Sequence, residues 1–153
     1  LRRMASKKPS RLDTDSAKSK RDGFLEAMRR NGLEFADHVL EAGETLASGM
    51  ETVQALLAQG VVPDGIVCGE DLTAAGALKA LLRAGLRVPG QVAVVGFNNS
   101  DYAHLCEPVL TSVDNKPEQV ALLCVQLLES SIERSEAYSS VVLQPELAQG
   151  ETS

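Results

Sequence analysis

Short runs of strand-forming residues alternate along this chain with longer segments whose hydrophobic residues recur at helical spacing. The clearest helical pattern runs from Thr45 to Gln59, where hydrophobic residues three or four positions apart share one face. These residues are Leu46, Met50, Val53 and Leu57. Gly60 suits the end of such a helix, and Pro63 prevents its continuation. The pattern therefore predicts an amphipathic helix with one buried face.

Three other segments predict helices: about Asp15 or Ser16 to Arg30, Asp71 to Ala84, and Pro117 to about Glu133. The first is followed by Asn31-Gly32, a common C-terminal stop. Asp71 can cap the second helix, and Pro117 suits the first turn of the third. The second helix carries an apolar stripe made of Ala74, Ala77, Leu78, Leu81 and Leu82.

Strands are predicted between these helices, at Gly65 to Gly69, Val92 to Phe97 and the extended segment Leu110 to Asp114. Further strands are expected at Phe35 to Leu40, at Tyr138 to Gln144 as a last or edge strand, and at Leu1 to Ala5 as a strand end. Strands that alternate with helices favour parallel pairing through right-handed crossovers. We therefore expect an α/β fold with a parallel sheet flanked by helices on both sides.

Composition and charge narrow the classes of protein. The 153 residues fit one domain, and no apolar run is long enough to span a membrane. Residues 1–21 hold eight Lys or Arg against two Asp, whereas the remainder holds seven against nineteen acids. The basic start fits either an anion-binding patch or, as we favour, a solvated loop. Because the acidic bulk repels phosphate backbones, we do not expect this chain to bind DNA by itself.

The chain has three cysteines, Cys68, Cys106 and Cys124. An odd count without a pairing pattern favours reduced thiols and a cytoplasmic location. Neither His38 nor His104 stands near a cysteine at the spacing of metal ligands, so no metal site is expected. We expect Cys68 and Cys124 to be small core residues.

The sequence offers little support for an enzyme. It contains no G-x-S-x-G elbow, no P-loop and no H-E-x-x-H. The two histidines lie in separate predicted segments and offer no pairing of base and nucleophile. We therefore expect neither an enzyme nor a bound cofactor.

Polar side chains follow two of the predicted strands. Val92 to Phe97 ends at Asn98-Asn99-Ser100-Asp101, and Gly65 to Gly69 ends at Glu70-Asp71. In parallel α/β sheets, ligands bind in the crevice beyond the carboxyl ends of the strands. These two loops are therefore placed to hold a small polar molecule.

The segment from Pro63 to Pro117 resembles the effector-binding domain of LacI/GalR-type transcription regulators. Its motifs include Pro-Asp-Gly-Ile-Val, Gly-Leu-Arg-Val-Pro, Val-Val-Gly-Phe-Asn and Pro-Val-Leu-Thr-Ser-Val, in the family's order. The resemblance is weaker upstream and covers roughly Met4 to Leu147. It implies that residues 1–153 are the C-terminal lobe of a two-lobed, periplasmic-binding-protein-like domain of type I.

The resemblance implies four ligand contacts: Lys20, Glu70, Asn98 and Asn115. The family usually has Asn where this chain has Glu70, and Asp where it has Asn98, so amide and carboxylate are exchanged. Lys20 stands where Arg is frequent, and Asn115 stands where Gln is frequent. Further similarity to a gluconate-repressor-like branch favours a sugar or a sugar acid as the effector.

The resemblance also implies a homodimer, through a face that includes Leu78, Leu82, Tyr102 and Leu105. The helix from 117 to 133 is apolar around most of its circumference and so needs cover on more than one face. In the resembled family this helix packs towards an N-terminal lobe that would precede Leu1. Burial in an oligomer is the alternative.

These features favour the effector-binding and dimerising part of a cytoplasmic repressor. Its DNA-binding helix-turn-helix would lie upstream, outside this chain, and an effector between the lobes would change the contact with operator DNA. One alternative is a periplasmic sugar-binding protein of the same fold. A second alternative is a small α/β enzyme that processes sugars.

Overall fold

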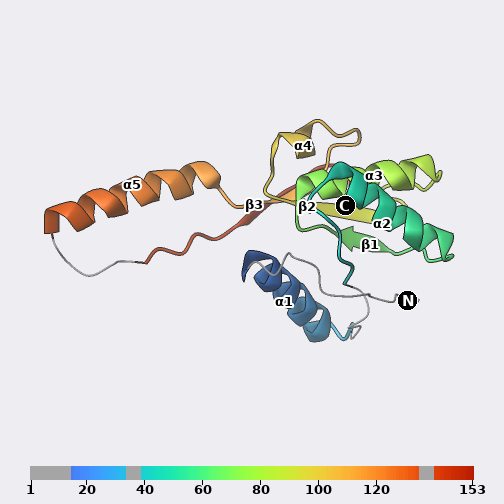
Figure 1. Ribbon diagram of the computed structural model, residues 1–153, viewed down its shortest axis with the longest axis horizontal. Coiled ribbons are helices and arrows are strands. Elements are labelled where there is room, and N and C mark those ends of the chain that lie inside the picture. Colours follow the sequence, from blue (N-terminus) through green and yellow to red (C-terminus); the bar gives the residue numbers. More distant parts are fainter. Residues whose placement is uncertain (1–14, 34–38, 135–139) are drawn as a thin grey trace.

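The computed structural model describes residues 15–33, 39–134 and 140–153. Helices and strands alternate through most of this part of the chain (Figure 1). The elements are α1 (Asp15–Arg30), α2 (Leu46–Ala58), β1 (Gly65–Val67), α3 (Asp71–Arg83), β2 (Ala93–Phe97), α4 (Asp101–His104), β3 (Thr111–Asp114), α5 (Pro117–Arg134) and β4 (Glu146–Ala148). All four predicted helices are confirmed, with ends that differ by at most one residue.

The sheet has four strands in the order β1-β2-β3-β4. The pairs β1–β2 and β2–β3 are parallel, with Ile66 opposite Val94 and Gly96 opposite Ser112. The pair β3–β4 is antiparallel, with Val113 opposite Leu147. The predicted α/β fold is therefore confirmed, but the sheet is mixed because the chain returns from α5 in the reverse direction.

The last predicted strand was misplaced. Residues 140–144 of the predicted segment Tyr138 to Gln144 form no strand, and the last strand is Glu146–Ala148 instead. Val142 is 84% exposed, because an apolar run needs a neighbouring strand before it becomes part of a sheet. The strand predicted at Leu1 to Ala5 and most of the one at Phe35 to Leu40 lie outside the described residues.

The core lies between α3 and the sheet, with α2 packed on α3 (Figure 1). Its largest fully buried apolar side chains are Leu81, Val92, Val94 and Leu110. The two helices approach closely at a pair of glycines. A Cβ atom on Gly49 would lie 2.1 Å from the Thr73 carbonyl oxygen, and one on Gly76 would lie 2.1 Å from that of Leu46. Only glycine allows this approach of backbone to backbone.

Helix α5 extends away from the sheet (Figure 1). It exposes apolar side chains along its length: Val120, Leu122, Val125, Leu128 and Ile132. Cys124 lies on this helix and is exposed, so its predicted place in the core was wrong, whereas Cys68 is buried as predicted. In the part of the chain that the structure describes, no helix is long and apolar enough to cross a bilayer.

Candidate functional site

The four side chains expected to contact a ligand lie in one chain of contacts at the carboxyl edge of the sheet. Lys20 comes from α1, Glu70 precedes α3, Asn98 follows β2, and Asn115 follows β3. Lys20 Nζ lies 3.3 Å from Glu70 Oε1. Asn98 Nδ2 donates a hydrogen bond to Glu70 Oε2, and Asn115 Nδ2 donates to Asn98 Oδ1 at 2.9 Å. Residues up to 95 positions apart in sequence are thereby brought together.

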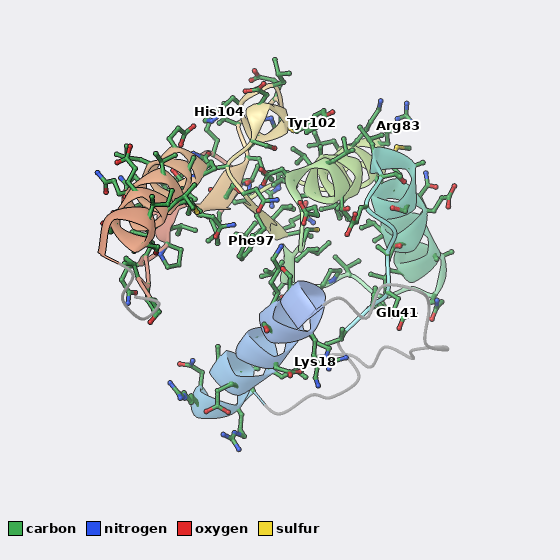
Figure 2. The ribbon with its side chains drawn as sticks, turned by 60° about the vertical axis from the view of Figure 1, so that its left-hand side comes forward. Lys18, Glu41, Arg83, Phe97, Tyr102 and His104 are labelled. Atoms are coloured by element: carbon green, nitrogen blue, oxygen red, sulfur yellow. The ribbon has the colours of Figure 1, made fainter. Side chains whose placement is uncertain are left out.

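Lys20 is held by three kinds of contact. Besides its ion pair with Glu70, its ammonium group donates to the carbonyl oxygen of Gly69 at 3.0 Å. The same group lies 4.1 Å from the centroid of the Phe97 ring, a cation–π distance. Lys18, labelled with Phe97 in Figure 2, is exposed on α1, as expected of a solvated lysine. The cation is therefore fixed over the end of β2 rather than extended into solvent.

The charges of this cluster balance, because one ammonium group meets one carboxylate. The Lys20 and Glu70 side chains are 24% and 35% exposed, so both remain accessible to a ligand. Glu70 occupies the N-cap position of α3, but its side chain makes no capping hydrogen bond. Its carboxylate contacts the other members of the cluster instead, which argues against a role only as a helix-start acid.

The prediction that Asp71 caps α3 was wrong. Asp71 is the first residue of that helix and is buried. Its carboxylate accepts hydrogen bonds from Ser100 and Ser112. The sequence alone gave no sign of these contacts, because both partners lie at least 29 positions away.

The loop after β2 has an unusual backbone. Asn98 and Asn99 adopt positive φ angles of 97° and 49°. Asparagine tolerates the left-handed region better than other residues with side chains. The Asn98 N–H donates to the carbonyl oxygen of Val113 at 2.8 Å, which ties the loop to β3. The paired asparagines therefore suit both the backbone and the polar contacts of the site.

Two of the three thiols, those of Cys68 and Cys106, are unsuited to nucleophilic chemistry. Burial, together with the charge of Asp71, raises the pKa of Cys68 to about 12. Burial and the same charge also raise the pKa of Cys106. Both thiols are therefore protonated at neutral pH, whereas a nucleophilic cysteine needs a lowered pKa. Among the described residues, no group of three or more His, Cys, Asp or Glu side chains is arranged to hold a metal ion.

The expected dimer residues fall into two groups. Leu82, Tyr102 and Leu105 are exposed, and Leu105 reaches 80% exposure. Leu78 is only 2% exposed and lies beneath a surface hollow of about 430 Å³. The hollow is lined by Leu46, Ala75, Leu78, Lys79, Leu82, Arg83, Cys106 and Glu107. Figure 2 shows Tyr102 and Arg83 on the same side of the molecule.

Known proteins resemble this chain in both sequence and fold. The chain is 32% identical over 138 residues to the HTH-type transcriptional repressor PurR of Pasteurella multocida (strain Pm70), covering 89% of this chain. It thus spans 41% of that repressor's length. The solved complex of the transcriptional regulator CelR with cellobiose matches with a TM-score of 0.82 and 28% identity, over 99% of this chain and 47% of that one.

A more distant structure has the same fold. The Lac repressor bound to ONPG in its repressed state matches with a TM-score of 0.85 at 22% identity, over 99% of this chain and 46% of that one. The family of periplasmic binding protein-like domains matches residues 4–153. The chain therefore belongs to the periplasmic binding protein-like family, in the form that serves as the effector domain of LacI/GalR-type regulators.

Proposed function

We propose that this chain is the effector-binding portion of a DNA-binding transcription regulator, and that Lys20, Glu70, Asn98 and Asn115 contact the effector. The observation that carries the proposal is their single chain of contacts at the carboxyl edge of the sheet. The relatives support the regulator over an exported binding protein or an enzyme, because they are named as transcriptional repressors and regulators.

The chemistry of the cluster suits a polyhydroxyl ligand. A carboxylate only accepts hydrogen bonds, an ammonium group only donates them, and the two amides do both. Sugar hydroxyls also donate and accept, so they can replace the contacts that these four side chains now make with one another. The Lys20 ammonium group can in addition meet a carboxylate, which extends the ligand class from sugars to sugar acids. The cellobiose bound to CelR supports this class.

The exposed apolar side chains of α5 are evidence for a second lobe. These side chains (Val120, Leu122, Val125, Leu128 and Ile132) would be costly to leave in water. In our proposal residues 1–153 form the C-terminal lobe, and α5 packs against an N-terminal lobe encoded upstream. The effector then lies between the lobes, and its binding changes their relative angle.

The whole regulator is proposed to be a cytoplasmic homodimer that binds operator DNA through an upstream helix-turn-helix. Leu82, Tyr102 and Leu105 form the exposed part of the dimer face, and Leu78 lines its hollow. A change in lobe angle would alter the spacing of two DNA-binding domains on the operator. The chain itself carries an acidic excess, so its own surface is not the proposed DNA contact.

The proposal is tested by titrating the full-length regulator proposed here, with both lobes, with gluconate and with cellobiose while recording the side-chain amide signals of Asn98 and Asn115 by NMR. At least one of the two ligands is expected to shift both signals at millimolar concentration. The amide signal of Gln59, at the end of α2, is the internal control and is expected to stay in place. If neither ligand moves the two asparagine signals more than that of Gln59, this site does not bind sugars or sugar acids.

A further inference from the structure

A buried carboxylate lies directly behind the proposed effector site. Asp71 is 1% exposed, and its side chain accepts three hydrogen bonds. Oδ2 accepts from the Ser100 backbone N–H at 2.7 Å and from the Ser100 hydroxyl at 2.8 Å. Oδ1 accepts from the Ser112 hydroxyl at 2.5 Å. A buried carboxylate is costly unless it is paired or fully hydrogen-bonded, and these donors meet that need.

Three consecutive backbone amides of the loop after β2 are held from outside the loop. The Asn98 N–H donates to Val113 O at 2.8 Å, and the Ser100 N–H donates to Asp71. Between them, the Asn99 N–H donates to Ser112 Oγ at 3.0 Å. Because the Ser112 hydroxyl donates in turn to Asp71, the carboxylate fixes Ser100 directly and Asn99 through one relay.

The backbone makes room for this carboxylate at Gly96. A Cβ atom at that position would lie 2.2 Å from Asp71 Oδ1 and 2.8 Å from Leu110 Cδ2. Since Gly96 belongs to β2, the strand that leads into the loop, the close approach needs a residue without a side chain. The Asp71 carboxylate is therefore the point at which α3, β2, β3 and the loop after β2 meet.

We propose that Asp71 is the positioning residue of the effector site, which rests on the function proposed above. Its carboxylate fixes Ser100 directly and Asn99 through Ser112, and so supports the left-handed conformations of the Asn98-Asn99 pair, which are costly and persist only where the surroundings impose them. Together with the bond from the Asn98 N–H to the Val113 carbonyl oxygen, this keeps the Asn98 amide between Glu70 and Asn115. Glu70 faces the effector site, whereas Asp71 fixes the loop that completes the site.

The test compares amide hydrogen exchange in the unmodified chain and in Asp71→Asn. Asparagine keeps the size of the side chain but loses its charge, and charge-assisted hydrogen bonds are roughly twice as strong as neutral ones. The Asn99 and Ser100 amides are expected to exchange about tenfold faster or more. The Val94 amide, which donates to Thr152 O in the core, is the reference. Asp101→Asn, which makes the same change at an exposed acid nearby, is expected to leave all three rates unchanged.

A second variant tests the relay and covers the case in which Asp71→Asn fails to fold. Ser112→Ala removes the acceptor of the Asn99 N–H but leaves the bond from Ser100 to Asp71. The Asn99 amide is then expected to exchange faster than the Ser100 amide. If either variant speeds exchange at Asn99, Ser100 and Val94 by equal factors, Asp71 supports the core as a whole and the positioning role is wrong.

The exchange measurement uses no effector, so it separates the two proposals. If gluconate or cellobiose binds the unmodified full-length regulator but the loop amides of Asp71→Asn stay protected, the function stands and the positioning role fails. If the loop loosens but neither ligand binds the unmodified full-length regulator, Asp71 orders the loop and the sugar-binding site is wrong. Faster loop exchange together with weaker binding in Asp71→Asn supports both proposals.

Discussion

At the scale of single residues, the ion pair of Lys20 and Glu70 decides which ligands suit the site. The pair is accessible to water, so it adds only about 0–1 kcal/mol to the stability of the fold. Its larger effect is on the charge that a ligand meets. With both groups present the charges of the cluster cancel. With Lys20 removed, the negative charge of Glu70 has no positive charge beside it in the cluster.

We therefore predict that Lys20→Met weakens the binding of gluconate by about tenfold or more, and that of cellobiose by less. A negatively charged ligand loses its only cation in the cluster and meets an uncompensated carboxylate, whereas a neutral sugar loses one donor. Isothermal titration calorimetry of the full-length variant measures both. The matched control is Lys18→Met on the same helix, since Lys18 is exposed and is expected to leave both affinities unchanged. Equal losses in the two variants would contradict the assignment of Lys20.

The cysteines give a prediction that depends on pH. Because burial and the charge of Asp71 raise the pKa of Cys68 to about 12, its thiol stays protonated in the folded chain at pH 8. Exposed Cys124 is expected to react with iodoacetamide long before Cys68 does. A thiol whose pKa is raised on folding stabilises the fold below the unfolded value of 9.0, and this stabilisation is lost as the pH rises towards 12.

Mass spectrometry of peptides after timed alkylation checks the order of reaction. Urea unfolding of the chain at pH 8 and at pH 10 checks the sign of the change in stability, and Cys68→Ser serves as the control that lacks this titration. Alkylation of Cys68 as fast as that of Cys124 in the folded chain would contradict its burial.

The sequence correctly predicted that three of the expected ligand contacts lie together at one edge of the sheet, whereas their contact with a ligand stays a prediction. Glu70, Asn98 and Asn115 follow β1, β2 and β3, so the topology alone brings them to one edge. Asp71 was misjudged because an acid at a helix start is locally indistinguishable from a cap. Its true partners, Ser100 and Ser112, are set by the packing of three elements and leave no local pattern in the sequence.

At the scale of elements, the crossing of α2 and α3 is set by two glycines. Gly49 and Gly76 each face the backbone of the other helix, where an added methyl group would lie 2.1 Å from a carbonyl oxygen. Backbone atoms do not move aside as the end of a flexible side chain does. The two helices would have to separate, and the core beneath α3 would lose packing.

We predict that Gly49→Ala and Gly76→Ala each destabilise the chain by about 1–3 kcal/mol, the usual cost of forcing extra atoms into a packed interior. Gly23→Ala on α1 is the matched control, because nothing lies within 4 Å of its added Cβ atom. That change is expected to be neutral or to stabilise the helix by about 0.5–1 kcal/mol. Urea unfolding followed by circular dichroism measures all three. A glycine variant as stable as the unmodified chain would show that the helices separate without cost.

Element prediction from periodicity worked best for helices. The stripes of α2 and α3 fixed both helices within one residue, because burial on one face leaves a clear repeat. The last strand was misplaced because the apolar run Val141, Val142 and Leu143 is by itself typical of a strand. The observed strand, Glu146–Ala148, forms instead through long-range pairing with β3. Which apolar run joins a sheet depends on its neighbours and not on the run itself.

At the scale of the whole molecule, the described residues leave at least two groups of apolar side chains exposed. One is the length of α5, whose all-round apolar pattern in the sequence already predicted cover from outside. The other contains Leu82, Tyr102 and Leu105 beside the hollow above Leu78. Sequence periodicity predicts such surfaces but does not name what covers each, because a partner leaves no local pattern.

The two surfaces predict different effects on association. In our proposal α5 packs against a second lobe of the same polypeptide, and the Leu82 surface forms the dimer. Leu82→Asp is then expected to reduce the sedimenting mass of the chain to that of a monomer. The reason is that an unpaired carboxylate in an apolar contact is strongly unfavourable. Leu122→Asp on α5 places the same charge on the other surface and is expected to leave the mass unchanged. Sedimentation equilibrium of both variants separates the two surfaces. A Leu82→Asp chain as large as the unmodified one would remove the proposed dimer face. Dissociation by Leu122→Asp alone would assign the association to α5, and would mean that a second copy occupies the surface proposed for the other lobe.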